Sequence, residues 1–137
     1  MQPTAADVTG LLRVLAEHDV EFLVVGGVCA VIHGAPISTF DLDIVPERSD
    51  ENVARLVRAL ATVDAGCIDV QEADGRGRDF SNLASRSHPI EVGNGLIVRV
   101  LDLDALIDIK REVAREKDLA TLPVLVRTLD ERRKRDA

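Results

Sequence analysis

Apolar residues divide the chain into short segments with the spacing of either a helix or a strand. Residues 7–18 repeat apolar positions at the three- and four-residue spacing of a helix, whereas residues 21–25 form the continuous apolar run of a buried strand. Residues 28–33 are apolar on every side, which predicts a short buried helix. A second strand is predicted at residues 41–45, and Pro46 closes it. The first third of the chain is therefore expected to run helix, strand, helix, strand.

The rest of the chain continues this alternation. Ser49 or Asp50 can cap a helix, and the Asn94-Gly95 pair suits the tight turn of a hairpin. The predicted inner face of that helix carries Val53, Leu56, Val57 and Leu60. The other predicted elements are strands at 67–70, 89–92 and 96–101, a loop at 74–78 and helices at 104–115 and 118–132. We expect a single α/β (α+β) domain over residues 1–137, with a small mixed sheet packed against helices and with C-terminal helices.

Composition and charge narrow the classes of partner. The chain is 46% hydrophobic over 137 residues and contains neither Trp nor Tyr, so the core is expected to be aliphatic. Its formal net charge of -7 argues against a basic groove that follows nucleic acid along its length, and any such contact would be local. The basic run at residues 132–135 is interpreted as a solvated helix end whose charge offsets the helix dipole.

Cysteine spacing and hydropathy bear on metal sites and on the compartment. Cys29 and Cys67 stand apart in apolar surroundings, without the Cys/His spacing of a structural zinc site, so both are expected to be reduced packing residues. The sequence shows no secretion signal at its start and no apolar segment long enough to cross a membrane. We therefore expect a cytoplasmic protein.

The candidate chemistry centres on Asp41 and Asp43 in the second predicted strand. Because side chains alternate between the two faces of a strand, these acids are expected to point the same way, with Cα atoms about 6.6 Å apart. At about 4 Å and an effective dielectric of about 20, two carboxylates repel one another by about 4 kcal/mol. A divalent cation reverses that energy, and Mg²⁺ prefers carboxylate and phosphate oxygens. The spacing therefore indicates a Mg²⁺ site suited to phosphoryl or nucleotidyl transfer.

Gly26 and Gly27 directly follow the first predicted strand and precede a helix. A glycine pair lets the backbone approach a ligand closely, and free N–H groups at the start of a helix favour phosphate. Each motif alone is weak, because a solvated acidic strand and a tight turn explain them equally well. Their order, beside a strand whose apolar sequence predicts a central position, favours a ligand site.

Two segments resemble the signature of the polymerase-β-type nucleotidyltransferase superfamily. They are Phe22-Leu-Val-Val-Gly-Gly-Val and His33-Gly-Ala-Pro-Ile-Ser-Thr-Phe-Asp-Leu-Asp-Ile-Val. The closer likeness is to small bacterial members related to the toxin component of type IV abortive-infection systems. The resemblance implies a minimal nucleotidyltransferase fold in which Gly26 and Gly27 contact a nucleoside triphosphate. It also implies that Asp41 and Asp43 bind Mg²⁺, with Ser38 or Thr39 supporting the site.

The likeness continues through Val98-Arg-Val-Leu-Asp-Leu-Asp-Ala-Leu-Ile into the C-terminal part of the chain. Here Lys110, Arg115, Lys117 and Asp118 resemble the Lys…Arg-x-Lys-Asp motif of those members. The resemblance implies nucleotide binding, in which Lys110 neutralises triphosphate charge and Arg115 forks onto its oxygens. From the residues alone, an ordinary charged helix face with internal ion pairs explains the same pattern.

Members of this superfamily usually carry a third carboxylate on a neighbouring strand. The best match is Asp69 in Gly66-Cys-Ile-Asp-Val, which resembles the family's Gly-x-Leu-Asp-hydrophobic strand, and Glu91 is the alternative. If Asp69 faces Asp41, it can complete the metal site and accept the proton of an attacking hydroxyl.

Three functions remain open. The first is an enzyme that moves a nucleoside monophosphate from an NTP to a hydroxyl on RNA, protein or a small molecule, releasing pyrophosphate. The second is a catalytically weakened binding or regulatory module, for example with a partner protein in a toxin–antitoxin pair. It is favoured by the short segment 61–66, where related members carry a longer one that can help to wall the nucleotide pocket. The third is an unrelated α/β domain whose acidic strand faces water and needs no metal.

Overall fold

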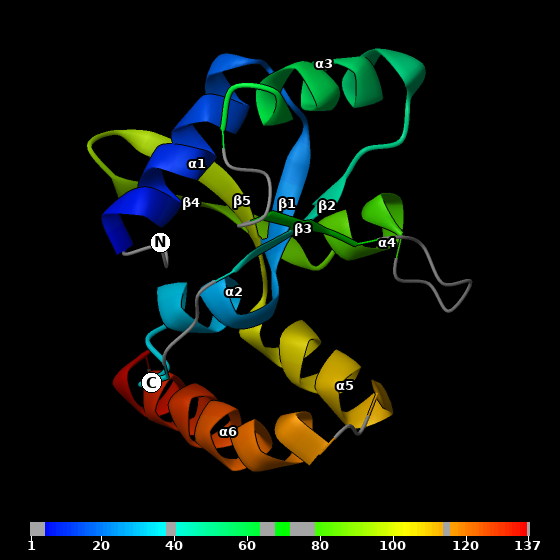
Figure 1. Ribbon diagram of the computed structural model, residues 1–137. Helices are drawn as coiled ribbons and strands as arrows, with labels where there is room; N and C mark the ends of the chain where they lie inside the picture. Colours follow the sequence, from blue (N-terminus) through cyan, green and yellow to red (C-terminus); the bar gives the residue numbers. More distant parts are fainter. Residues whose placement is uncertain (1–4, 38–40, 64–67, 72–78, 114–115, 137) are drawn as a thin grey trace.

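The computed structural model describes residues 5–37, 41–63, 68–71, 79–113 and 116–136 (Figure 1). Its elements, in chain order, are α1 (Ala5–Glu17), β1 (Phe22–Val25), α2 (Gly26–Ile32), β2 (Leu42–Pro46), α3 (Asp50–Leu60), β3 (Ile68–Val70), α4 (Phe80–Ala84), β4 (Ser87–Gly93), β5 (Leu96–Leu101), α5 (Leu103–Val113) and α6 (Glu116–Asp136). No helix within these ranges combines the length and the hydropathy needed to cross a membrane.

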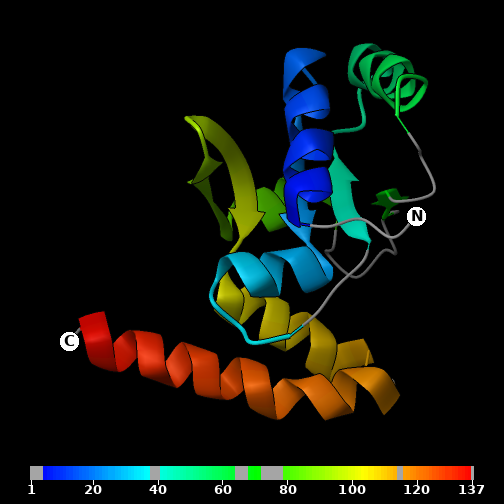
Figure 2. The same cartoon turned by 60° about the vertical axis from the view of Figure 1, so that its left-hand side comes forward.

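The five strands form one mixed sheet in the order β3-β2-β1-β5-β4. β1 runs antiparallel to β2 and parallel to β5, β2 runs parallel to β3, and β4 and β5 form an antiparallel hairpin. Helices pack around this sheet, with α2, α5 and α6 at one end of the molecule and α1 and α3 towards the other (Figures 1 and 2). This arrangement confirms the expected α+β fold with C-terminal helices.

β1 lies at the centre of the sheet, as its apolar sequence predicts. Leu23 and Val24 are fully buried, although their side chains point to opposite faces, so both faces of β1 are covered. Helix α4 lies on the face to which Leu23 points. Arg99 of β5 pairs with Leu23, and its side chain donates a hydrogen bond to the carbonyl oxygen of Ala84 in α4. The expected aliphatic core is observed, and its fully buried side chains include Leu12, Leu15, Leu23, Leu42, Ile44, Leu101 and Leu125.

Local sequence signals place the predicted turn and helix cap correctly. Asn94 and Gly95 both have positive φ, 51° and 79°, which is the backbone of a tight two-residue hairpin turn. The Ser49 side chain accepts a hydrogen bond from the backbone N–H of Asn52 and so caps α3.

The predicted inner face of α3 is wrong in part. Leu56 is buried as predicted, but Val53 and Val57 are exposed, and Asn52 and Ala59 are buried in their place. The reason is that the Asn52 side chain bonds three backbone groups, the N–H and C=O of Glu21 and the C=O of Glu47, and so ties α3 to the ends of two strands. These tertiary partners turn a polar residue inward, because they satisfy its hydrogen bonds.

Three helices differ from their predicted extents. α2 begins at Gly26, two residues early, and its Val31 is exposed rather than buried. The sequence did not predict α4, a helix of 5 residues whose start is capped by the Asp79 side chain. α6 continues to Asp136 and accommodates Pro123 within its length. Short helices such as α2 and α4 depend on tertiary contacts more than on periodicity.

Candidate active site at the Asp43 edge of the sheet

Asp43 lies on β2 between two neighbouring strands. The register pairs it with Val25 of β1 on one side and with Asp69 of β3 on the other. Side chains of directly paired residues project from the same face of a sheet, so the two carboxyl groups are neighbours. Asp43 is half-buried, whereas Asp69 is exposed. The structure therefore aligns Asp69 with Asp43 rather than with Asp41.

Asp41 lies immediately before β2 and is exposed. Asp41 thus lies just outside the strand that contains Asp43, so strand alternation alone does not set the orientation of its side chain. Its negative charge nevertheless raises the pKa of Asp43. The three acids share one region of the molecule, and Asp43 is the most buried of them.

Gly26 makes room for the Asp43 carboxylate. The first residue of α2 has a φ of +68°, and a Cβ atom built on it would lie 2.1 Å from Asp43 Oδ2 and 3.0 Å from Asp43 Cβ. Glycine is the residue that adopts this backbone without strain, and here it also removes the clash. Gly27 follows in the first turn of α2 and is half-buried. The glycine pair and the acidic strand, predicted separately, therefore meet at Gly26 and Asp43.

The electrostatics at Asp43 are unfavourable for the isolated carboxylate. Burial is the main cause that raises its pKa, followed by the charge of Asp69, a hydrogen bond with Asp69 and the charge of Asp41. A hydrogen bond from Gln71 acts in the opposite direction, and the balance raises the pKa to about 6. Three acidic groups thus share this region and together raise the pKa of Asp43, which is an environment that attracts a cation.

Gln71, which sequence reasoning missed, contacts Asp43 directly. Its Nε2 atom donates to Asp43 Oδ1 at 3.2 Å, and its carbonyl oxygen accepts from Arg48 Nη2 at 2.8 Å. Gln71 follows Asp69 by two residues, at the end of β3. Period-two alternation from Asp69 is the signal that could have drawn attention to it.

The structure describes only some of the other expected site residues. Ser38, Thr39 and Arg115 lie outside the described residues, and so do the side chains of Lys117 and Asp118 in the first turn of α6. Lys110 is half-buried on α5. Burial raises the pKa of Cys29 on α2, and the charge of Lys110 opposes a small part of that rise. The loop predicted at 74–78 and Cys67 also fall outside the described residues.

The alternative third acid, Glu91, is wrong as a partner of Asp43. It is exposed on β4, at the far side of the sheet, and β1 and β5 lie between β4 and β2. A hairpin was predicted correctly from local sequence, but its position in the sheet depends on the parallel pairing of β5 with β1.

The carboxylates of this site suit a metal that needs few protein ligands. Among the described residues, no group of three or more His, Cys, Asp or Glu side chains is arranged to hold a metal ion. Asp43 and Asp69 still provide two adjacent carboxylates. Mg²⁺ commonly binds one or two carboxylates and fills its remaining positions with water and substrate phosphates. The donor set therefore fits a Mg²⁺ ion that completes its coordination with water or substrate oxygens better than it fits a closed all-protein metal site.

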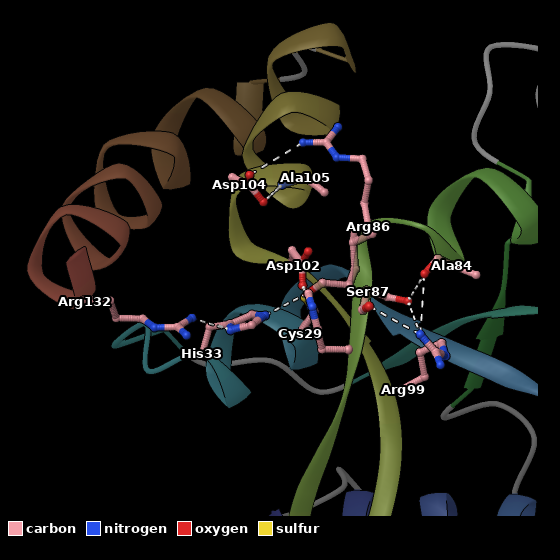
Figure 3. Close-up of polar contacts among 12 residues, drawn as sticks. Cys29, His33, Ala84, Arg86, Ser87, Arg99, Asp102, Asp104, Ala105 and Arg132 are labelled. Carbon is pink, nitrogen blue, oxygen red and sulfur yellow. Dashed lines mark hydrogen bonds and ion pairs between the residues drawn. The ribbon is translucent and has the colours of Figure 1, made fainter. Parts of the chain in front are cut away.

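A second polar cluster lies at the other end of α2 (Figure 3). His33, the C-cap residue, contacts the carbonyl oxygen of Leu101 through Nε2 at 2.7 Å, and its Nδ1 lies 2.6 Å from Arg132 Nη1. Since the guanidinium can only donate, Nδ1 accepts and the Nε2–H group donates to Leu101. The Cys29 thiol also donates to the carbonyl of Leu101, at 3.1 Å, and burial raises the pKa of this thiol to about 12. Cys29 is therefore a protonated packing residue, as expected.

Comparison with known proteins finds neither a matching family model nor a matching curated protein.

Proposed function

We propose that this protein is a metal-dependent nucleotidyltransferase that moves a nucleoside monophosphate from an NTP to a hydroxyl acceptor. The supporting observation is Asp43, a half-buried carboxylate that packs on Gly26 beside Asp69 and whose pKa is raised to about 6. Such a group lowers the stability of the fold when it is charged. Perturbed groups of this kind concentrate at functional sites.

Mg²⁺ is the cation that fits this proposal. Asp43 and Asp69 would hold it through carboxylate oxygens, with Asp41 as the third candidate ligand. When bound, Mg²⁺ supplies positive charge that offsets the triphosphate and the pyrophosphate formed from it.

The chain's own residues would bind the nucleotide and move the proton. Gly26 and Gly27 would contact the triphosphate through their backbone, and Asp69 is exposed to an acceptor. The space that a side chain on Gly26 would take is filled by the Asp43 carboxylate. The acceptor oxygen forms its bond to the α-phosphorus as the bond to the pyrophosphate oxygen breaks, and the acceptor proton passes to an Asp69 oxygen. Ser38, Thr39, Lys110, Arg115, Lys117 and Asp118 are proposed to contact the nucleotide, on the resemblance alone.

A second candidate is a catalytically weakened module of the same fold that binds a partner protein, as in a toxin–antitoxin pair. The observation that favours it is the short connection from the end of α3 at Leu60 to the start of β3 at Ile68. Both candidates are proposed to act in the cytoplasm. The acceptor of the nucleotidyltransferase is proposed to be RNA, protein or a small molecule.

Isothermal titration calorimetry on the full chain tests the proposal. We expect binding of at least one of the four NTPs in the presence of Mg²⁺, and loss of binding in EDTA. Asp41→Ala and Asp43→Ala should weaken binding at least tenfold. Asp130→Ala, which removes an exposed acid from α6, is the matched control and should bind like the wild type. Equal binding with and without metal would contradict the proposal.

Transfer of label from an α-³²P NTP separates the two candidates. Label incorporated into total RNA, total protein or a small-molecule pool identifies the enzyme and its acceptor class. Weak or absent nucleotide binding without transfer, together with a partner protein captured in pull-downs, supports the weakened module. An unrelated domain shows neither metal dependence nor nucleotide binding.

A further inference from the structure

The two oxygens of the Asp43 carboxylate have different surroundings. Oδ2 faces Gly26, where a Cβ atom would lie 2.1 Å from it. Oδ1 accepts a hydrogen bond from Gln71 Nε2 at 3.2 Å. The carboxylate is therefore held from two sides, by a close backbone approach on α2 and by an amide at the end of β3. This contact sets the direction of the lone pairs that remain for another ligand.

Gln71 is itself anchored to two neighbouring segments. Its backbone N–H donates to the carbonyl oxygen of Ile44 at 2.9 Å, which extends the pairing of β3 with β2 by one residue. Its own carbonyl accepts from Arg48 Nη2 at 2.8 Å, and Arg48 belongs to the connection between β2 and α3. The Gln71 backbone thus has a defined position, from which its side chain reaches Asp43.

An amide has the right chemistry for a residue that orients a metal ligand. It donates a hydrogen bond but carries no charge, so it fixes one carboxylate oxygen while the negative charge stays available to a cation. A lysine or arginine in the same place would compete with the metal, and a carboxylate would add repulsion. Groups that hydrogen-bond to metal ligands commonly tune metal affinity by 10–100-fold.

We propose that Gln71 is a positioning residue that orients Asp43 for Mg²⁺, and that Arg48 holds Gln71 in place for this task. The inference rests on the proposed function. It adds two residues to the site, neither of which belongs to the acidic or glycine motifs. A purely structural role, in which Gln71 only ties β3 to β2, predicts a loss of stability without a change in metal affinity.

The test is a titration of the full chain with Mn²⁺ alone, in which free Mn²⁺ is followed by electron paramagnetic resonance. Gln71→Met keeps the length of the side chain and removes the donor. We expect the dissociation constant to rise about tenfold in Gln71→Met and by a smaller factor in Arg48→Ala. Arg58→Ala, an exposed arginine on α3, is the matched control and should leave it unchanged.

Thermal unfolding in EDTA gives the second measurement. The side chain of Gln71 is exposed, so Gln71→Met is expected to unfold within a few degrees of the wild type. A Gln71→Met protein that binds Mn²⁺ as tightly as the wild type overturns the positioning role, whatever its melting temperature. Wild-type protein that binds no Mn²⁺ instead overturns the proposed function itself, and this inference with it.

Discussion

The two ends of helix α2 carry different polar groups, a half-buried carboxylate among other acids at its start and a hydrogen-bonded histidine at its end. At its start, Gly26 contacts Asp43, whose pKa is raised by burial and by the neighbouring acids Asp69 and Asp41. At its end, His33 has a partner at each ring nitrogen. Both sites are partly buried and both join elements distant in sequence. They differ in the groups that surround them: burial and like charges raise the pKa of Asp43, whereas each ring nitrogen of His33 has a hydrogen-bond partner.

On the proposed function, this difference separates a ligand site at the start of α2 from contacts that stabilise the fold at its end. Hydrogen-bonded groups at the His33 end stabilise the junction of α2 with α6 and with the end of β5. Both ring nitrogens of His33 are paired within the fold. At the Asp43 end, burial and the like charges of Asp69 and Asp41 raise the pKa of a carboxylate, which lowers stability when that group is charged. Proteins retain such arrangements where function requires them. The comparison predicts that neutralising Asp43 and removing the Arg132 side chain have opposite effects on stability and unequal effects on binding.

The largest effect is expected for Gly26→Ala. The positive φ of +68° costs an alanine about 1–3 kcal/mol, and the clash with Asp43 adds about 1–3 kcal/mol. We expect urea denaturation to show this loss and calorimetry to show no binding of Mg²⁺ and NTP. The control is Gly34→Ala, whose φ is +100° but whose added Cβ meets no atom within 4 Å. Gly34→Ala should lose stability through strain alone and keep binding, and equal binding by both variants would contradict the role of Gly26.

Asp43→Asn should stabilise the metal-free protein above pH 7. The folded-state pKa of about 6 exceeds the ordinary value of 3.8, so the wild type loses stability as the pH rises from about 4 to about 6. Such a pKa difference corresponds to about 3 kcal/mol in a fully buried site, and solvent screening at this half-buried group reduces it to about 1–1.5 kcal/mol.

Urea denaturation of both proteins in EDTA at pH 4 and pH 7.5 measures this effect of Asp43→Asn. The variant should be the more stable one at pH 7.5, the difference should shrink at pH 4, and Mg²⁺ binding should be lost. A variant that is less stable than the wild type at pH 7.5 would show that the carboxylate is compensated within the fold.

Arg132→Ala should produce a smaller loss at the other end of α2. It removes the donor that lies 2.6 Å from His33 Nδ1, which corresponds to about 1 kcal/mol. Binding of Mg²⁺ and NTP should stay at the wild-type level, because the contact lies at the opposite end of the helix. Arg133→Ala removes the same charge from an exposed neighbour and serves as the control. A loss of binding in Arg132→Ala alone would show that the two ends of α2 are coupled.

The smallest effect is the pH dependence that His33 contributes. Burial is the main cause that lowers its pKa, Arg132 lowers it further, and the carbonyl of Leu101 and the nearby Asp102 and Asp104 partly oppose them. The unfolded chain therefore binds the proton more readily, and stability falls as the pH drops below about 6.5. Asp43 gives the opposite slope. In Asp43→Asn, the melting temperature should fall as the pH drops below about 6.5, because only the His33 contribution remains. In the double variant that also carries His33→Gln, the melting temperature should depend less on pH over this range.

Predictions from local sequence held best where neighbours along the chain decide the structure. The hairpin turn depends on two consecutive residues, Asn94 and Gly95, that tolerate positive φ. The cap of α3 depends on Ser49 and a backbone group three residues later. Asp43 could be identified as a candidate because Asp41 and Asp43 alternate along a predicted strand that follows the Gly26-Gly27 pair in the sequence. The inner face of α3 could not, because Asn52 is drawn inward by Glu21, 31 residues away.

The sequence by itself determined the central apolar strand, the glycines after it, the acidic strand and the mixed α/β order of elements, since hydrophobic period and backbone preference are local properties. Only the tertiary structure decided which acid lies beside Asp43, because Asp69 and Glu91 differ in the strand partners of β3 and β4 and not in their local patterns. It also decided that Gln71 contacts Asp43 across 28 residues and that Arg132 meets His33 across 99. Such contacts depend on the packing of whole elements, and no local periodicity encodes them.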